Sequence, residues 1–347
     1  MLSDIYKGCG ILLLSVLLVP AAFGQVTSED VGTDKLAQTG FKFLKISPDA
    51  RVAAMAGAMT SADLGSSVAM FYNPAGMASQ TSHFSAAFSR TQWIADFNYS
   101  AISAAFNSGK FGVFGVSLMF ADYGDGIIGT VPAATDKGYV EYSELGLSNP
   151  SPSAFTVGVT YAKTLTDRFS VGGTAKFASQ DLGTALISQA DGTETKDNEL
   201  STFAFDLGIL YRTGFRSLNF AMSVRNFAGE VNYVDENFEL PLTFNVGVSM
   251  DMLDLGNMDS DTHSFLLALE AERPRDYSEQ LRIGGEYSFS NILFLRAGYV
   301  FPTDEEGINL GAGLRYDVGT IGFGVDYAYT SFGVFDNVQR FGLHLSF

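Results

Sequence analysis

The chain has 347 residues, of which 46% are hydrophobic and only 17% charged, and its formal net charge is −17. Such an acidic chain offers no basic surface to phosphates, which disfavours nucleic-acid binding. Beyond the N-terminus no apolar run reaches the ~20 residues of a transmembrane helix. Helical spans are therefore excluded from the mature chain, but a membrane β-barrel, whose strands alternate, stays open.

The first 24 residues predict a secretory signal peptide. Lys7 precedes an apolar run over residues 11–19, and Ala22-Phe23-Gly24 places small residues where a signal peptidase cleaves. We expect cleavage after Gly24; an uncleaved anchor helix is the alternative. Because the single cysteine, Cys9, lies in this segment, the mature chain has no disulfide.

The stretch from residue 39 to residue 80 is rich in alanine, glycine and serine, so it can pack closely against other backbone. Asn73-Pro74 predicts a turn, and Gly76 permits a positive φ just after it. We assign residues 25–81 to an N-terminal periplasmic or hatch segment.

From residue 82 to the C-terminus, stretches of alternating polarity repeat between turn residues. In residues 321–330, for example, Phe323, Val325 and Tyr327 fall on one face, and Gly322, Gly324 and Asp326 on the other. About fourteen such strands are predicted. They begin near residues 82, 96, 110, 153, 168, 201, 215, 239, 263, 278, 291, 307, 319 and 337. The sequence thus predicts an all-β, antiparallel transmembrane barrel over residues 82–347.

The connections support this prediction. Every other one is short, as at residues 107–110, 165–168 and 317–320, whereas residues 123–152 and 181–200 are expected to form long solvated loops. Short turns at the periplasmic end and long loops outside are typical of outer-membrane barrels. A soluble β-sandwich would have shorter strands and would keep its charges outside.

The polar face of these strands carries charges of both signs, which we place in the lumen. They are Lys176, Asp206, Arg212, Glu270, Arg282, Glu286, Arg296, Arg315, Asp326 and Arg340. Two interpretations are equally open: these groups pair across the interior, or they merely line water.

The final strand has large apolar side chains at Phe341, Leu343, Leu345 and Phe347. It must pair with the first strand, because unpaired backbone cannot face lipid. We predict that these four residues close the barrel and signal its insertion. A barrel of fourteen strands has a wide lumen, so residues 25–81 are expected to fold into it as a plug.

The opening of the mature chain resembles the signature of the PorV/PorQ family, within the FadL-like superfamily of outer-membrane barrels. The matching residues are Phe43-Leu44-x-Ile46, Ala50-Arg51, Met55-x-Gly57-Ala58 and Asn73-Pro74-Ala75-Gly76; Ala56 departs from the glycine usual in the family. From this match we take Arg51, Gly57, Asn73, Pro74, Ala75 and Gly76 as the hatch motif.

The resemblance implies a 14-stranded barrel with a hatch in its lumen, in the outer membrane of a Gram-negative cell. PorV-like proteins serve type IX secretion: they receive exported cargo and pass it to a surface attachment complex. FadL-like relatives instead let hydrophobic small molecules through. The implied partners are outer-membrane lipid and either secretion-system proteins and their cargo or hydrophobic compounds. A third alternative is a structural barrel whose acidic loops bind a partner protein.

No catalytic motif is present. His83, His263 and His344 lie far apart in sequence, and the acidic loop near residues 124–144 lacks the alternating ligands of a calcium loop. We expect a protein that is not an enzyme and that has no metal or cofactor.

Overall fold

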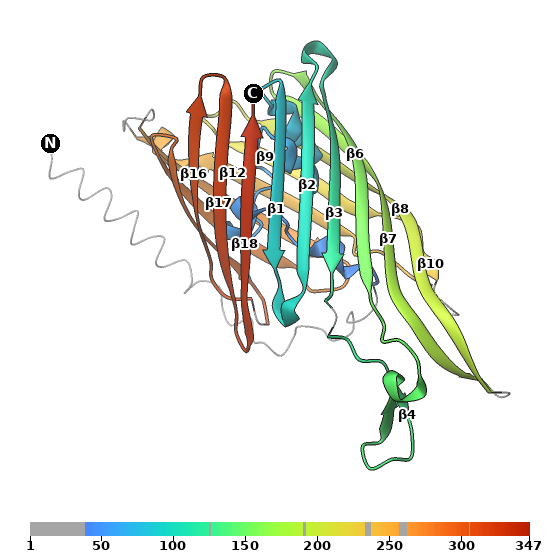
Figure 1. Cartoon of the computed structure of the whole chain (residues 1–347). Helices are drawn as coiled ribbons and strands as arrows, with labels where there is room; N and C mark the ends of the chain where they lie inside the picture. Colours follow the sequence, from blue (N-terminus) through green and yellow to red (C-terminus); the bar gives the residue numbers. More distant parts are fainter. Residues whose placement is uncertain (1–38, 125, 190–191, 233–236, 257–261, 305) are drawn as a thin grey trace. The chain divides into compact units, whose positions relative to one another are not determined.

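The computed structural model describes residues 39–347 except 125, 190–191, 233–236, 257–261 and 305. The predicted signal peptide (residues 1–24) and residues 25–38 lie outside the described residues. Fourteen antiparallel strands close into one barrel (Figure 1), in the order β1-β18-β17-β16-β15-β14-β13-β12-β9-β8-β7-β6-β3-β2. The predicted fold class is therefore confirmed.

The barrel strands are bounded as follows. They are β1 (Phe84–Gln92), β2 (Asn98–Asn107), β3 (Val113–Asp122), β6 (Ser153–Thr166), β7 (Phe169–Gln189), β8 (Gly192–Arg212), β9 (Asn219–Phe227), β12 (Thr243–Asp251), β13 (His263–Pro274), β14 (Gln280–Phe289), β15 (Leu293–Phe301), β16 (Asn309–Val318), β17 (Ile321–Phe332) and β18 (Phe335–Ser346).

The seam of the barrel is the pairing of β18 with β1, in which Leu343 lies opposite Phe88 and Leu345 opposite Ala86. Phe347 extends the seam, because its backbone exchanges hydrogen bonds of 3.0 and 2.9 Å with Phe84. The rings of these two residues stack at 5.1 Å. No edge is left open at the seam, as closure of a barrel requires.

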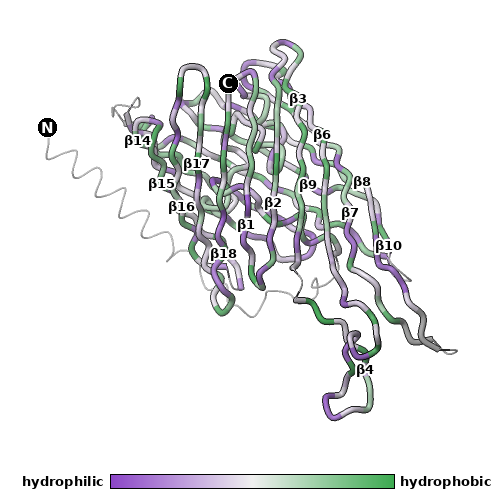
Figure 2. Tube along the Cα trace, viewed as in Figure 1, coloured by the Kyte–Doolittle hydropathy of each residue, from purple (hydrophilic) through white to green (hydrophobic). Residues whose placement is uncertain are grey.

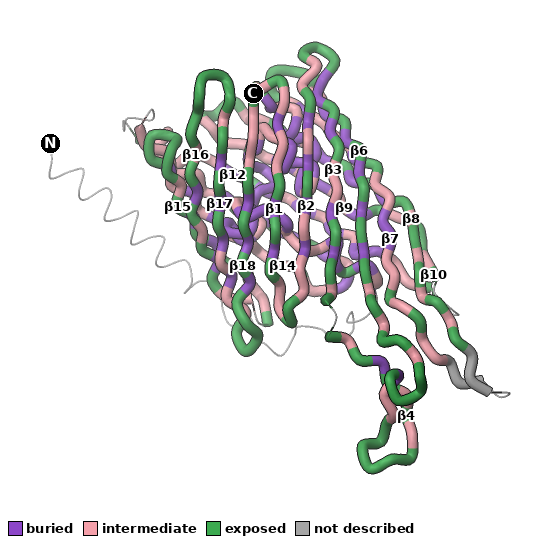
Figure 3. The backbone as a smooth tube through the Cα atoms, in the orientation of Figure 1, coloured by how far each residue is buried: buried purple, intermediate pink, exposed green. Residues whose placement is uncertain are grey.

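Hydropathy and burial alternate along the strands of the wall (Figures 2 and 3), because successive side chains of a strand face opposite sides of the sheet. On β17 the outward Phe323, Val325 and Tyr327 are 41–48% exposed, whereas the inward Asp326 and Ala328 are fully buried. The outer face is thus apolar and the inner face polar or small, which is the arrangement of a barrel that faces lipid acyl chains.

The two ends of the barrel differ. At one end, which we call the short-turn end, tight connections join β2 to β3, β6 to β7, β14 to β15 and β16 to β17. The opposite, long-loop end carries the connection from β3 to β6, with the small hairpin β4 (Thr130–Pro132) and β5 (Tyr139–Glu141), and the one from β9 to β12, with β10 (Val231–Asn232) and β11 (Asn237–Phe238).

The prediction of a solvated loop at residues 181–200 is wrong. Strands β7 and β8 continue to Gln189 and from Gly192, so this stretch is a long hairpin that projects beyond the barrel at the end opposite the C-terminus (Figure 1). Outside the bilayer no apolar face is required, so its strands lack the alternation of large apolar residues that marks the others.

Short helices precede the barrel. They are η4 (Lys42–Lys45), α2 (Ala50–Ala54), η5 (Ser67–Phe71) and η6 (Pro74–Ser79). No helix among the described residues is both long and apolar enough to cross a bilayer.

Candidate functional site

Residues 39–82, which we call the inner segment, run through the lumen from one mouth of the barrel to the other. At the long-loop end the backbone N–H of Phe41 donates to Gln180 Oε1 on β7 at 3.1 Å. At the short-turn end Gln80 Nε2 donates to the carbonyl oxygen of Ala105 on β2 at 3.3 Å. Between these points the segment contacts inward-facing residues on most strands of the wall.

Local sequence explains the two main folded units of the inner segment. Helix α2 begins after Asp49, whose carboxylate accepts a hydrogen bond from the Val52 N–H at 3.0 Å and so caps the helix. Helix η6 begins after Asn73, whose Oδ1 accepts from Ala75 N–H at 3.0 Å, with Pro74 at the first helical position.

A chain of ion pairs attaches α2 to the wall. Arg51 Nη2 lies 2.7 Å from Glu286 Oε1 on β14, and its Nε donates to Oε2 of the same carboxylate at 2.8 Å. Glu286 also pairs with Arg296 on β15 at 2.5 Å. Arg51 thus binds in the two-pronged manner that suits guanidinium and carboxylate groups.

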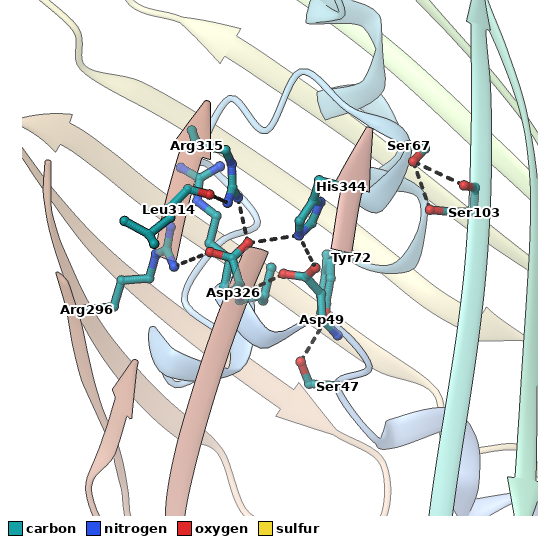
Figure 4. Close-up of polar contacts among 12 residues, drawn as sticks. Ser47, Asp49, Ser67, Tyr72, Ser103, Arg296, Leu314, Arg315, Asp326 and His344 are labelled. Atoms are coloured by element: carbon teal, nitrogen blue, oxygen red, sulfur yellow. Dashed lines mark hydrogen bonds and ion pairs between the residues drawn. The ribbon is translucent and has the colours of Figure 1, made fainter. Parts of the chain in front are cut away.

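The same chain continues to Asp326 on β17 (Figure 4). Its fully buried carboxylate lies 2.7 Å from Arg296 Nη1, 2.6 Å from Arg315 Nη2 and 2.8 Å from His344 Nε2. His344 Nε2 is also 3.6 Å from Asp49, the residue that caps α2. Strands β14 to β18 therefore meet the N-terminus of α2 through one polar cluster.

The other predicted lumen charges also have partners. Glu270 accepts two hydrogen bonds of 2.9 Å from the N–H and hydroxyl of Thr60. The remaining ion pairs are Lys176–Asp206 at 2.8 Å, Arg212–Asp63 at 2.7 Å and Arg282–Glu272 at 2.8 Å. Arg340 donates through Nε to the carbonyl oxygen of Ser47 at 3.0 Å. Of the two interpretations that the sequence left open, the structure shows pairing.

Two patches of glycine on the wall let the inner segment approach its backbone. Gly172 on β7 and Gly208 on β8 are cross-strand neighbours. A Cβ on Gly172 would lie 2.4 Å from the carbonyl carbon of Pro74, and one on Gly208 would lie 1.9 Å from Asn73 Oδ1. Because real side-chain carbons never come so close, the Asn73–Pro74 turn needs glycine at both positions.

The second patch consists of Gly284, Gly298 and Gly311 on β14, β15 and β16. Added Cβ atoms there would lie 2.4–2.6 Å from atoms of Met55, Ala56 and Ala54. The small residues of the inner segment and the glycines of the wall therefore fit each other at both α2 and η6. In the sequence, these glycines fall on the inward-facing positions of the alternating strands. That placement was the one signal that could have located these patches.

The structure places the six residues of the predicted hatch motif as follows. Arg51 binds Glu286, and Gly57 has the positive φ of 80° that ends the turn after α2. Asn73 caps η6 and donates from Nδ2 to the carbonyl oxygens of Thr60 and Ile209 at 2.8 and 3.1 Å. Pro74 and Ala75 begin η6 and lie against Gly172.

The positive φ that glycine permits is not adopted at Gly76. Gly76 lies within η6 and is not among the residues with a positive φ. A Cβ on Gly76 would meet that of Ala69 at an ordinary 3.4 Å, so the packing at this position does not require glycine.

Two cavities flank α2. One, of about 240 Å³, opens at the short-turn end and is lined by Asp49, Arg51, Arg315 and His344 among others. The other, of about 440 Å³, lies at the long-loop end and is lined by Ala53, Arg282, Arg340, Trp93 and Phe332 among others. Helix α2 and its ion pairs therefore stand between the two mouths.

A polar latch holds the start of the inner segment at the long-loop end. The ammonium groups of Lys42 and Lys45 both bind the carboxylate of Asp276, in the connection from β13 to β14, and the Lys45 contact measures 2.9 Å. Burial raises the pKa of Asp276, but hydrogen bonds from the two lysines outweigh it and lower the pKa to about 2. The sequence contained no signal that joined these three residues.

Within the described part of the chain, no cluster of three or more histidine, cysteine, aspartate or glutamate side chains could hold a metal ion. His344, the histidine nearest the centre of the site, is engaged with Asp326.

No family model matches this sequence, and no curated protein matches it. Solved structures do match this chain. The CymD monoaromatic hydrocarbon channel is 10% identical and has a TM-score of 0.55, with 87% of this chain and 98% of that chain covered. A ΔS2S3 mutant of the TodX monoaromatic hydrocarbon channel is 12% identical, with a TM-score of 0.50 and coverage of 80% and 93%. At this identity the likeness establishes the fold. The chain has the barrel fold of these channels.

Proposed function

We propose that the chain is a non-catalytic outer-membrane barrel of the PorV/PorQ type, which receives exported proteins of a type IX secretion system and passes them to a surface attachment complex. The observation that carries the proposal is the inner segment. Its residues Arg51 and Asn73, which the family signature contains, hold a plug in the lumen through Glu286 and the carbonyl of Ile209.

A plugged barrel suits a docking role better than free passage. Charged groups of the wall are bound to each other or to the inner segment between the two cavities, as at Arg296 and Asp326. An apolar molecule crossing there would have to separate buried ion pairs, which costs several kcal/mol for each uncompensated charge. The projecting β7–β8 hairpin and the β4–β5 connection offer protein-sized surfaces instead.

Deletion of the gene in its native bacterium tests the proposal. Proteins that carry a C-terminal sorting domain should then stay uncleaved and unattached at the cell surface, and the wild-type gene on a plasmid should restore them. The abundance of an unrelated outer-membrane barrel serves as the control for general envelope damage. Normal maturation and attachment of the sorted proteins in the deletion strain would contradict the secretion role.

A second candidate is a channel for hydrophobic small molecules. The fold shared with CymD and TodX supports it, as does the cavity of about 440 Å³ at the long-loop end, which Trp93, Phe332 and Phe335 line. This candidate predicts slower uptake of a radiolabelled monoaromatic hydrocarbon after deletion, with sorted proteins attached normally. Unchanged uptake would count against it.

A further inference from the structure

Three neighbouring turns form one arc of the short-turn end. They comprise residues 108–112 between β2 and β3, residues 163–168 at the end of β6 and the turn to β7, and residues 213–218 between β8 and β9. These strands follow one another around the barrel in the order β2-β3-β6-β7-β8-β9, so the three turns are consecutive at that end. We call these three stretches the β2–β9 rim.

Side chains join the turns of the β2–β9 rim to one another. Tyr161 Oη on β6 donates to the carbonyl oxygen of Phe111 at 2.9 Å, and Arg168 Nη1 donates to that of Thr213 at 3.4 Å. A Cβ on Gly214 would lie only 2.7 Å from the guanidinium carbon of Arg168, so these two turns are in close contact. The β2–β9 rim is therefore one continuous surface.

The β2–β9 rim is basic, although the chain as a whole has a net charge of −17. It carries Lys110, Lys163, Arg168 and Arg216 but only one carboxylate, Asp167. Three of these cations are exposed and Lys163 is half-buried. No ion pair joins any of the four to a residue that the structure describes. Their charges are therefore available to an anion from outside the chain.

The other turns of the short-turn end differ from the β2–β9 rim. Residues 252–262, 290–292 and 319–320 contain no lysine or arginine, and the exposed Asp317 lies beside the last of these turns. The turns of this end therefore carry their positive charge on one side of the barrel.

Exposed apolar side chains lie beside the cations. Phe111, Leu165 and Phe215, one from each turn, are 56–64% exposed. The ammonium group of Lys110 lies 5.4 Å from the centroid of the Phe111 ring. Cations next to exposed aromatic side chains, at the edge of an apolar band, are typical of a membrane interface.

Lys163 indicates the side from which the anion comes. This residue shares the outward face of β6 with the exposed Val157 and Val159, and the strand ends three residues later. An ammonium group on the lipid-facing side of a barrel is stable where its side chain can reach the headgroups. A soluble protein cannot approach through the bilayer, whereas a lipid headgroup can contact Lys163 there.

We propose that the β2–β9 rim binds the headgroups of anionic phospholipids. Its lysines and arginines neutralise the phosphates, and its exposed apolar side chains enter the boundary of the acyl chains. An acidic segment of a partner protein fits less well, because it would leave Lys163 and the apolar side chains without a partner. The proposal rests on the membrane location given under the proposed function, but not on the secretion role.

Native mass spectrometry of the full chain in detergent micelles tests the proposal. The probes are phosphatidylglycerol, whose headgroup is anionic, and phosphatidylcholine with the same acyl chains, whose headgroup is zwitterionic. The fraction of the barrel that retains each lipid is measured in an equimolar mixture. A phosphatidylglycerol with a photoreactive headgroup then locates the site, because the cross-linked peptides can be identified.

We expect phosphatidylglycerol to be retained at least about tenfold more than phosphatidylcholine, because each cation near an anionic headgroup strengthens binding. Higher salt should reduce this preference, since the charges are exposed. The cross-links should fall within residues 108–112, 163–168 and 213–218.

A variant of the rim removes three of its cations. In Lys110→Gln/Lys163→Gln/Arg216→Gln the preference for phosphatidylglycerol should fall to about threefold or less. Arg168 is kept, because its hydrogen bond to Thr213 joins two turns.

The matched control is Arg90→Gln/Lys137→Gln/Lys196→Gln. It removes the same charge from the long-loop half of the molecule, on β1, the β3–β6 connection and the β7–β8 hairpin. We expect its preference to stay within about twofold of that of the unmodified chain.

Equal retention of the two lipids by the unmodified chain would overturn the proposal. So would an equal loss of preference in the two variants, since the attraction would then follow net charge. Displacement of the cross-links by a soluble glutamate homopeptide would assign the rim to an acidic protein instead. None of these results bears on attachment of sorted proteins in cells, so the secretion role and this site can fail separately.

Discussion

Asp326 shows how strongly single charges matter in this lumen. Its fully buried carboxylate faces Arg296, Arg315 and His344, so Asp326→Asn would leave the buried guanidinium of Arg296 and the partly exposed one of Arg315 short of a counter-charge. Breaking a buried pair from one side typically costs about 3–5 kcal/mol. We expect a decrease of that size in the free energy of unfolding, measured by urea titration of the barrel in lipid vesicles.

The matched control for this variant is Asp317→Asn on β16, because the Asp317 side chain is exposed near the end of the same hairpin. A change at an exposed position without such partners usually stays within about 0.5 kcal/mol. If the two variants lost the same stability, the cluster around Asp326 would not be the source of the effect.

The latch at Asp276 gives the inner segment a defined pH dependence. The pKa of this carboxyl is lowered to about 2 in the folded protein, from an ordinary value of 3.8. The stabilisation by Lys42 and Lys45 is therefore complete above about pH 4 and is lost as the pH falls towards about 2. We expect amide exchange of residues 41–46 to accelerate over that range, by about tenfold after correction for intrinsic rates.

Asp276→Asn supplies the comparison, because it removes the titrating group. In that variant, exchange at residues 41–46 should already be fast at neutral pH and should show no step between about pH 4 and about pH 2. A step of equal size in the variant would assign the pH dependence to another carboxylate.

At the scale of elements, the fit between η6 and the glycine patch on β7 and β8 can be tested with adjacent residues. A methyl group on Gly172 would collide with the backbone of Pro74, whereas one on Gly173 would meet its nearest atom, Leu207 Cδ2, at an ordinary 3.4 Å. Gly172→Ala should cost about 1–3 kcal/mol, as overpacking does, and should expose residues 73–79 to limited proteolysis. Gly173→Ala should change stability by less than about 1 kcal/mol and leave the proteolytic pattern unchanged. Equal patterns would contradict the close fit.

Most strands were predictable because the bilayer imposes a pattern on them. The expected strand at residue 153 begins at Ser153, and the one expected at 319 begins at Ile321. The expected start at residue 201 misses β8 by nine residues, because the strand begins at Gly192. Alternation of large apolar side chains reports contact with lipid, so it marks the spanning part of a strand and not its extension into water.

The sequence could predict which residues belong to the site, but not which of them contact one another. The alternation of side chains along the strands placed Glu286 and Asp326 in the lumen, and the family resemblance pointed to Arg51. Alternation cannot show that Arg51 binds Glu286, because that contact depends on how the inner segment lies across the barrel. Asp63, Thr60 and Asp276 carried no signal at all, since each is one polar residue in an irregular stretch whose partner is more than a hundred residues away.

At the scale of the whole molecule, the inner segment decides whether this barrel conducts. The segment spans the lumen from Asp276 at one mouth to Ala105 near the other, and its ion pairs close the space between the two cavities. The full chain in a planar bilayer should therefore show no sustained ion conductance. Deletion of residues 39–80 should open a steady conductance, because a barrel of fourteen strands is too wide for its own side chains to fill.

The Asp276→Asn variant tests whether the inner segment is a permanent plug or a gate that opens when its long-loop end is released. It loosens only the long-loop end of the inner segment, while Arg51 and Glu286 still hold α2 to the wall. We therefore expect it to stay closed in the same bilayer, whereas Asp326→Asn, which weakens the cluster beside α2, should produce brief openings. Steady conductance of the unmodified chain, at the level of the deletion variant, would show that the inner segment leaves a path open and would favour the channel over the docking barrel.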